Sequence, residues 1–458
     1  VSDSLRHLGF EIERFKTGTP CRINGRSIDY GQCERQDGDT PPTLFSFLAD
    51  TISSTRDDLF TLNKWADSRF HVEQVPCWIT WTNPSTHAVI QDNLDQSPMY
   101  SGKIEGVGPR YCPSIEDKVV RFADQERHQG FLDPEGRQTR EHYINGGATA
   151  LPYEVQLAFI RSIAGLQHAE IIRPGYAVEY DYCPPTQLAA TLETKKISGL
   201  YFAGQINGTS GYEEAAGQGL LAGANAALKV QGKGPLILKR DQAYLGVMID
   251  DLVTKGCTEP YRMFTSRAEY RLLLRQDNAD QRLTPTATAL GLADTLRASR
   301  CREKMESLQR AQTFVRDCRH DGIKLDHWFR RAENSWISLP DSIRTKYAAE
   351  LWPLIETDFK YEGHLARQLQ QVERMAKQEG RRIPAGTDYS MISGLKHEAR
   401  ARLGEIQPHT LGQAARISGI TPADIAILAI HLEKGRQERA GSQEGNTSKM
   451  PRRGKGGA

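Results

Sequence analysis

The sequence lacks paired cysteines and long hydrophobic runs. Its eight cysteines are spread without a C-x-x-C pair or a histidine–cysteine cluster, which argues against a zinc site and against a disulfide framework. No apolar run is long enough to cross a bilayer, and the first residues resemble neither a signal peptide nor a transit peptide. A reducing compartment is the simplest expectation.

The sequence also lacks net charge. Lys and Arg number 59 against 57 for Asp and Glu, so the formal charge is only +2. Any surface for nucleic acid must therefore be local. The length of 458 residues exceeds what one hydrophobic core usually serves, and we expect two or three domains.

An initial methionine and a G-x-G-x-x-G motif after a strand are both missing. The chain opens inside an amphipathic helical pattern that contains Leu5, Leu8 and Phe10, so we expect it to be N-terminally incomplete. Without the G-x-G-x-x-G motif, the chain lacks the usual fingerprint of a dinucleotide-binding turn.

A glycine-rich run from Gly199 to Gly223 is the most informative stretch that is present. It predicts a short strand over Leu200–Ala203, a turn over Gly204–Gly211 and a helix from Tyr212 onward. A bare backbone loop before a helix can hold a phosphate or an anionic ring edge. An ordinary turn between a strand and a helix is the alternative, although the polar side chains in this turn exceed what a connector requires.

Cys112 is the cysteine most typical of a reactive thiol. Arg110 precedes it by two residues and Lys118 follows it by six, and nearby cations stabilise a thiolate. It lies in a loop punctuated by glycine and proline, from Ser97 to Ser114, and long loops inside compact domains are often functional. A structural thiol is the alternative.

A second cationic segment runs from Glu259 to Arg282. Arg267, Arg271 and Arg275 recur every four residues, which predicts one helical face with aromatic residues interleaved. Guanidinium groups bind phosphates and aromatic rings stack on unpaired bases, so RNA binding is the functional interpretation. A solvated helix with local ion pairs is the alternative.

The pattern along the chain predicts an α/β fold with a helical C-terminal part. Strands and helices mix as far as about residue 239, with a two-strand hairpin signature in Lys118–Ala123, His128–Leu132 and a glycine turn at Asp133–Gly136. Helical periodicity dominates from 240 to 433, where Thr421 is the expected N-cap of a helix. The segment 434–458 is rich in Gly, Ser, Lys and Arg, and we expect it to be disordered.

Several long motifs resemble the MnmG (GidA) family of flavin-dependent tRNA uridine 5-carboxymethylaminomethyl modification enzymes. The resemblance covers nearly the whole chain up to about residue 433. It rests on Lys16-Thr-Gly-Thr-Pro, Gly25-Arg-Ser-Ile-Asp29, Gln74-Val-Pro-Cys-Trp-Ile-Thr80, the Ser97 to Lys118 loop, the Thr191 to Gly223 run, the Glu259 to Arg282 run and the Pro408 to Ala423 motif.

The resemblance implies a Rossmann-type FAD/NAD(P)-binding domain with an inserted mixed α+β domain and an all-α C-terminal domain. The FAD-binding part would comprise 1–30 and 144–239, the inserted NADH-associated domain 31–143, and the helical domain for tRNA and GTPase docking 240–433. A basic disordered tail would follow at 434–458.

The resemblance also implies the reaction. With an MnmE-type GTPase, such an enzyme modifies C5 of the wobble uridine, at position 34, of certain tRNAs. Methylenetetrahydrofolate would supply the one-carbon unit, NADH would reduce the flavin, and glycine or ammonium would supply the amine. A homodimer, a heterotetramer with the GTPase and a cytoplasmic location away from membranes are expected, or a mitochondrial one if a missing N-terminus carries a transit peptide.

Site residues follow by position in the matching motifs. Cys112 would be one of two catalytic thiols, acting on C6 of uracil or assisting methylene transfer, and no metal is expected. Cofactor contacts would come from Gly204, Gln205, Asn207, Gly208, Gly211, Tyr212, Glu213, Gly108, Pro109 and Lys118. Contacts to tRNA would come from Arg110, Arg262, Arg267, Arg271 and Arg275.

Departures from the family pattern give a further expectation. The family's N-terminal G-x-G-x-x-G segment and its other catalytic cysteine would precede Val1, and Cys21 stands where the family usually has proline. We therefore expect this chain alone to be inactive and its FAD affinity to be reduced. Two alternatives remain: a folate- and FAD-dependent tRNA uracil methyltransferase, which the large helical part disfavours, and a non-catalytic RNA-binding assembly protein.

Overall fold

The computed structural model describes residues 1–39, 62–65, 69–72, 75–104, 106–109, 113–136, 138–379 and 381–433. The chain forms two compact units, and it passes between them several times. Unit 1 comprises Val1–Pro184, Gln205–Gly211 and Cys257–Arg262. Unit 2 comprises Pro185–Gly204, Tyr212–Gly256 and the described residues from Met263 onward.

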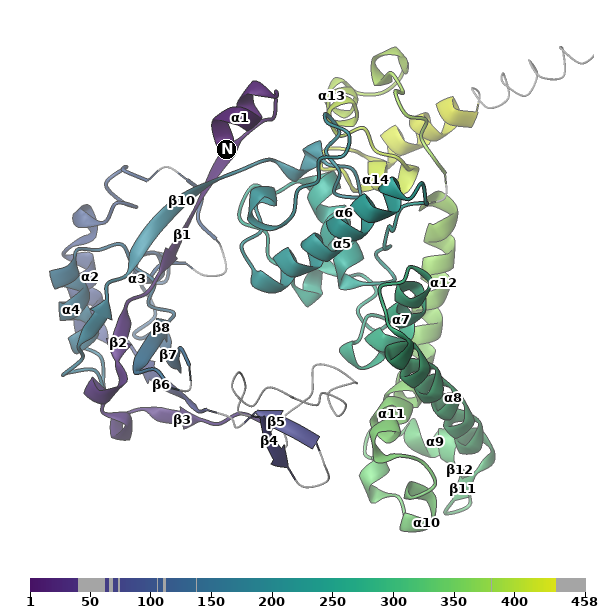
Figure 1. The fold of residues 1–458 in the computed structure, drawn as a ribbon, viewed down its shortest axis with the longest axis horizontal. Coiled ribbons are helices and arrows are strands. Elements are labelled where there is room, and N and C mark those ends of the chain that lie inside the picture. Colours follow the sequence, from purple (N-terminus) through teal and green to yellow (C-terminus); the bar gives the residue numbers. More distant parts are fainter. Residues whose placement is uncertain are drawn as a thin grey trace, which may run out of the picture. The chain divides into compact units, whose positions relative to one another are not determined.

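Unit 1 is built on an antiparallel six-stranded sheet with the order β3-β6-β7-β8-β2-β9 (Figure 1). Its central register places Leu132 opposite both Trp78 and Ile144. Leu132 and Ile144 are buried, as expected where alternate residues of a strand face a core. In sheet order, the strands are Glu34–Gln36, Cys77–Trp81, Gln129–Pro134, Glu141–Asn145, Arg22–Asn24 and Ile171–Arg173.

Helices α2 (Pro84–Gln91), α3 (Ile115–Arg121) and α4 (Tyr153–Arg161) share one hydrophobic core with this sheet. Asn83 caps α2 by accepting a hydrogen bond from the Thr86 N–H, and Pro84 occupies the first turn. The sequence predicts a short helix at Thr86–Asn93 and an amphipathic helix at Leu151–Ile163, and the structure confirms them as α2 and α4.

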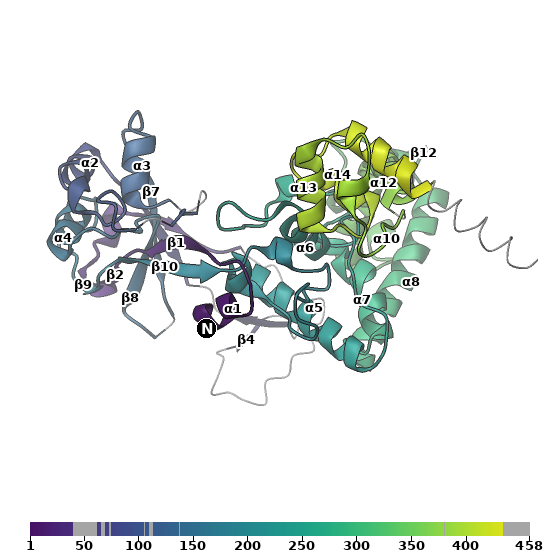
Figure 2. The ribbon, with the colours of Figure 1, turned by 90° about the horizontal axis from the view of Figure 1, so that it is seen from above.

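Strands β1 (Glu13–Thr19) and β10 (Tyr176–Tyr182) form a separate antiparallel ribbon (Figures 1 and 2). The register pairs Phe15 with Tyr180 and Glu13 with Tyr182, so these four side chains lie on one face. The sequence predicts strands within Ala169–Tyr182 around the Arg173-Pro-Gly turn, and the structure confirms them as β9 and β10. Unit 1 also contains α1 (Ser2–His7) and a hairpin of β4 (Leu62–Trp65) and β5 (Arg69–Val72).

The strand predicted at Lys118–Ala123 is wrong, because α3 covers most of it. Ser114 starts this helix by accepting a hydrogen bond from the Asp117 N–H at 3.1 Å, and acidic residues fill the first turn. The prediction rested on alternating apolar residues, but the Ser114 cap favours a helix over a strand. Strand β7 pairs instead with β8, beyond the predicted turn.

Unit 2 is predominantly helical, as predicted for residues 240–433, and it contains the small hairpin β11 (Arg319–His320) and β12 (Ile323–Lys324). Its first long helix begins at Tyr212, as predicted. The helices are α5 (Tyr212–Val230), α6 (Tyr244–Lys255), α7 (Ala279–Ala289), α8 (Thr295–Asp317), α9 (Leu325–Phe329), α10 (Asp341–Arg344), α11 (Trp352–Lys360), α12 (Glu362–Glu379), α13 (His397–Ile406), α14 (Leu411–Arg416) and a last helix over 422–433.

Two hydrophobic cores organise the later part of unit 2. One surrounds Phe329 and Trp352, which are fully buried between α8, α9 and α11. The other joins α13, α14 and the last helix through residues such as Leu403, Ala414 and Leu428. In the described ranges, no helix has both the length and the apolar character needed to cross a membrane.

The predicted domain limits do not coincide with the two units. Strands β2 and β9 come from the ranges assigned to the FAD-binding part. They lie in the same sheet as β3, β6, β7 and β8, which come mainly from the range assigned to the insertion. The segment 434–458, predicted to be disordered, and most of the surface insertion predicted at Thr51–Asp67 lie outside the described residues.

Candidate cofactor loop and cationic segment

The glycine-rich run is divided between the two units. Residues Gln205–Gly211, termed the glycine loop below, belong to unit 1, whereas Gly204 and α5 belong to unit 2. The strand predicted before this run is wrong: at Leu200–Ala203 only Tyr201 makes a β-bridge, to Glu193. A short 3₁₀ helix, Gly204–Asn207, follows.

Three consecutive carbonyl groups of the glycine loop accept hydrogen bonds from the rest of unit 1. Ile206 accepts from the Cys183 N–H at 2.7 Å, Asn207 from the Cys257 thiol at 3.6 Å, and Gly208 from the Tyr261 N–H at 2.9 Å. In a planar trans peptide the N–H of the next residue points to the opposite side. The peptide N–H of Thr209 therefore points away from the Tyr261 donor, while the Gly208 N–H donates to the Gln205 carbonyl at 2.9 Å.

Gly208 and Thr209 occupy unusual positions in the loop. Gly208 has φ +74°, and a Cβ there would lie within 3.1 Å of side-chain atoms of Cys257, Phe15 and Tyr182. Only glycine fits this conformation and this space. Thr209 is fully buried, and among the described residues its hydroxyl oxygen has no hydrogen-bond partner. A buried polar atom of this kind usually binds something.

The part of the run in unit 2 is held by side chains that the sequence did not single out. The Gln218 side chain accepts a hydrogen bond from the Gly204 N–H at 2.8 Å, and Glu214 accepts one from the Met263 N–H at 3.1 Å. Both are buried on α5, four residues apart. The sequence signal for these two residues was a pair of polar side chains four positions apart within a run of small apolar residues. Tyr212 and Glu213, which were predicted, are exposed on the first turn.

The loop before α3 runs along β1. Lys16 donates its N–H to the Val107 carbonyl at 3.0 Å, and a Cβ at Gly108 would lie 3.2 Å from the Lys16 side chain. Lys118 on α3 donates to the Gly146 carbonyl at 2.8 Å, while Pro109 is half-buried. Arg110 and Cys112 lie outside the described residues.

Glu116 is a buried carboxyl that sequence reasoning missed. One oxygen accepts from the Ser97 hydroxyl at 3.3 Å, the Thr149 hydroxyl at 3.0 Å and the Ala150 N–H at 3.1 Å. The side chain joins α3 to segments on both sides of it in the chain. Its position in the first turn of a helix resembled an ordinary N-terminal carboxylate, and nothing in the sequence indicated its burial.

The helix predicted over the cationic segment is wrong. The segment contains a 3₁₀ turn at Thr265–Arg267, further turns, another 3₁₀ turn at Gln276–Asn278 and then α7. Arginines four residues apart therefore do not share one helical face. In unit 2, contacts to Arg240 hold Arg267 and Glu269 in place, and these tertiary contacts override the periodicity.

The predicted arginines differ in their surroundings. Arg275 pairs with Asp277 at 2.9 Å and Asp358 at 2.8 Å. Arg267 lies 3.9 Å from the Asp251 carboxylate. Arg271 in unit 2 and Arg262 in unit 1 are exposed. Exposed guanidinium groups are more available to phosphate than one held by two carboxylates.

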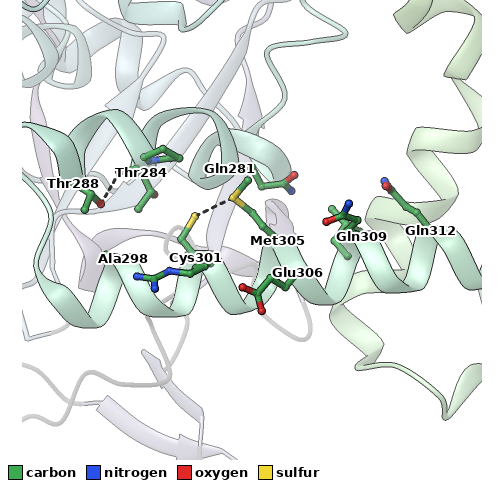
Figure 3. A pocket seen from close by; sticks show the side chains of 12 residues that line it. Gln281, Thr284, Thr288, Ala298, Cys301, Met305, Glu306, Gln309 and Gln312 are labelled. Atoms are coloured by element: carbon green, nitrogen blue, oxygen red, sulfur yellow. Dashed lines mark hydrogen bonds between the residues drawn. The ribbon is translucent and has the colours of Figure 1, made fainter.

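A hollow of about 550 Å³ lies between α7 and α8 (Figure 3). Its lining includes polar side chains, with Gln281 and Thr288 on α7 and Gln309 and Gln312 on α8. Cys301 on α8 lies within hydrogen-bond distance of the Met305 sulfur, and burial raises the pKa of its thiol. None of the predicted site residues lines this hollow.

The fold defines a class before any comparison: an α/β protein with a glycine-rich loop before a helix, followed by a helical C-terminal part. The family described as Glucose inhibited division protein A matches residues 1–234. The tRNA modifying enzyme MnmG/GidA C-terminal helical bundle matches residues 371–455.

Curated relatives agree over almost the whole chain. The tRNA uridine 5-carboxymethylaminomethyl modification enzyme MnmG of Protochlamydia amoebophila is 53% identical, covering 95% of this chain and 68% of its own length. The enzyme of the same name from Lacticaseibacillus paracasei is 48% identical, with 95% and 70% covered. The chain belongs to the MnmG/GidA family of tRNA-modifying enzymes.

Solved structures confirm the fold class. Aquifex aeolicus GidA in its form I crystal has a TM-score of 0.82 and 46% identity, covering 94% of this chain and 70% of that chain. The form II crystal gives 0.81 and 43%, with 94% and 69% covered. The predicted Rossmann-type fold with a helical C-terminal bundle is therefore correct.

Proposed function

We propose that the chain acts in an FAD-dependent enzyme that modifies C5 of the wobble uridine of certain tRNAs. One observation carries this proposal: enzymes named for 5-carboxymethylaminomethyl modification of tRNA uridine are about half identical to this chain over some 95% of its length. In the proposed reaction, methylenetetrahydrofolate supplies the carbon and glycine or ammonium the amine. When bound, the flavin would supply electron and hydride exchange with NADH.

The glycine loop fits a group such as FAD. The buried Thr209 hydroxyl has no partner in the described part of the chain, and the Thr209 peptide N–H points away from the Tyr261 donor. In unit 1 we assign Gln205, Asn207, Gly208 and Gly211 to the flavin. We also assign Gly204, Tyr212 and Glu213, which belong to unit 2.

The remaining chemistry is assigned to the segment before and within α3. Gly108, Pro109 and Lys118 would contact NADH, and the Cys112 thiol would act on C6 of uracil or assist methylene transfer. The Lys118 ammonium donates a hydrogen bond to the Gly146 carbonyl. This side chain therefore reaches polar groups beside α3, which supports its proposed role in binding a polar ligand.

Contacts to tRNA are assigned to Arg110, Arg262, Arg267, Arg271 and Arg275. The exposure of Arg262 and Arg271 supports this most directly, since their guanidinium groups are accessible to phosphate. We further propose an MnmE-type GTPase as partner of the helical domain at 240–433, a homodimer and a heterotetramer with that GTPase. The FAD-binding part at 1–30 and 144–239 and the inserted domain at 31–143 complete the proposed domain organisation.

Mass spectrometry of tRNA wobble uridines tests the function. The intact gene that contains this chain should restore the 5-substituted uridine to cells that lack it. A Cys112→Ser variant should not, whereas a Cys318→Ser variant, altered in the helical part, should behave like the original. Restoration of 5-methyluridine instead would indicate the methyltransferase alternative, and full modification by Cys112→Ser would indicate a non-catalytic RNA-binding protein.

A further inference from the structure

We infer that Cys257 and Tyr182 are positioning residues that fix the backbone of the glycine loop, and through it the loop's contacts with the flavin. The inference rests on the proposed function, because it assigns the loop to FAD. Both residues belong to unit 1, together with the loop. Neither is among the residues expected to contact the cofactor.

Cys257 holds the middle peptide of the loop in two ways. Its thiol lies 3.6 Å from the Asn207 carbonyl oxygen and donates to it. Its sulfur also occupies the space beside Gly208, where a Cβ would lie only 2.7 Å away. The thiol therefore fixes the direction of the Asn207 carbonyl and sets how closely the next residue can approach the protein.

Tyr182 fixes the position of Cys257 through a hydrogen bond to its carbonyl group. Its hydroxyl lies 3.2 Å from the Cys257 carbonyl oxygen and also contacts the Glu13 carboxylate. Its ring stacks on Phe15 with the centroids 3.9 Å apart and the planes within 8°. Both rings lie about 3 Å from the Cβ position of Gly208. The loop thus rests on a buried aromatic pair whose polar end is tied to Cys257.

The charge state of these groups suits a fixed support. Burial raises the pKa of Cys257 to about 12, so the thiol keeps the proton that it donates to Asn207. Burial, followed by the hydrogen bond to Glu13, raises the pKa of Tyr182 as well. A thiolate at Cys257 would instead repel the carbonyl oxygen.

Fixing the carbonyl groups of the glycine loop also fixes the direction of its peptide N–H groups. With the Ile206, Asn207 and Gly208 carbonyls all engaged, the peptide planes cannot rotate freely. The N–H group of Thr209 is then held in the orientation that an anionic or carbonyl edge of a ligand requires. Pre-organised donors bind better because less ordering is left for the binding step.

Fluorescence titration with FAD tests the inference on the full chain. We expect Cys257→Ala to weaken FAD binding about 2- to 10-fold, the range for losing one neutral hydrogen bond. Cys257→Ser, which keeps a donor, should recover part of the affinity, and Tyr182→Phe should weaken binding in the same direction. Cys21→Ala is the control, because Cys21 is another thiol of the same unit, more deeply buried in its hydrophobic core and away from the glycine loop. It should lower the melting temperature without changing FAD affinity.

Amide hydrogen exchange provides a readout that needs no flavin. In the FAD-free chain, Cys257→Ala should accelerate exchange at Gly208 and Tyr261, whereas Cys21→Ala should not. Unchanged exchange and unchanged FAD affinity in Cys257→Ala and Tyr182→Phe would overturn the inference. If the original chain binds no FAD, the exchange experiment still decides whether these residues brace the loop.

Discussion

At the scale of single residues, Arg240 shows how one buried side chain can organise its surroundings. Its side chain is only 9% exposed, and it bonds to Asp250 at 3.1 Å, Asp251 at 2.8 Å and Glu269 at 2.9 Å. It also donates to the carbonyl of Arg267. One cation therefore connects α6 to the cationic segment, within unit 2.

Replacing Arg240 by Met should destabilise unit 2 by about 3–5 kcal/mol, because the buried carboxylates of Asp250 and Asp251 would each lose one cationic partner. Urea unfolding followed by circular dichroism measures this change. Arg344→Met is the control: Arg344 forms an exposed pair with Asp341, worth about 0–1 kcal/mol. Equal effects of the two substitutions would contradict a central role for Arg240.

A pair of histidines in unit 1 makes stability depend on pH. The rings of His87 and His128 lie 5.1 Å apart, and His87 shares a hydrogen bond of 2.8 Å with the Thr82 hydroxyl. Burial lowers the pKa of both, and for His128 the neighbouring His87 and Lys118 lower it further. Below about pH 6.5 the unfolded chain binds more protons than the folded one, so stability falls as the pH falls.

The melting temperature should therefore drop between pH 7 and pH 5, and His128→Gln should reduce that drop. Thermal unfolding at both pH values measures the difference. His168→Gln, at an exposed position, should leave the drop in melting temperature the same as in the original chain. A drop of equal size in His128→Gln would show that the pair does not contribute.

At the scale of elements, helix caps decide where several helices begin. Thr421 caps the last helix: its hydroxyl lies 2.5 Å from the Asp424 carboxylate, which also accepts from the Thr421 N–H at 3.0 Å. The Asp424 N–H in turn faces the Thr421 hydroxyl at 3.4 Å. The sequence predicts Thr421 as the N-cap, followed by Pro422 at the first helical position, and the cap is confirmed.

Thr421→Ala should destabilise the C-terminal bundle by about 1 kcal/mol, the usual cost of losing such a cap. Hydrogen exchange in 422–433 measures the effect locally. Thr421→Ser keeps the hydroxyl and should cost less. Faster exchange confined to other helices would rule out a capping role.

Local patterns predicted those elements whose signals are local. Helices α2, α4, α5 and α12 carry clear periodicity or start signals, and the structure has all four. The predicted strand at Lys118–Ala123 and the predicted helix across Arg267, Arg271 and Arg275 failed for a different reason. Ser114 and Arg240, lying outside those patterns, supply the hydrogen bonds that decide the conformation.

The candidate site, too, could be predicted only in part from local sequence patterns. The glycine-rich run was recognisable from its composition, but its division between two units was not. Segments 205–211 and 257–262 join unit 1 through hydrogen bonds between residues such as Gly208 and Tyr261, and no periodicity reports such pairings. Glu116 was missed because burial of a carboxyl depends on partners from distant parts of the chain.

At the scale of the whole molecule, each unit has hydrophobic cores of its own. Leu132 is fully buried in the core of unit 1, and Phe329 is fully buried in a core of unit 2. Separate cores allow one unit to be destabilised with little effect on the other.

Leu132→Ala should cost about 2–5 kcal/mol and Phe329→Ala about 3–5 kcal/mol. Hydrogen exchange should accelerate within 1–184 for the first variant and within α8, α9 and α11 for the second. Acceleration spread evenly over both units in either variant would show that they unfold as one.

The division of the chain between units also imposes an order on synthesis. During translation the ribbon of β1 and β10 is complete once residue 182 has emerged, but the donor for the Gly208 carbonyl is the N–H of Tyr261. The backbone of the glycine loop therefore cannot be fixed until almost eighty further residues have been synthesised. A nascent chain that stalls in that interval can fold the sheet of unit 1 yet cannot complete the backbone hydrogen bonds of the glycine loop.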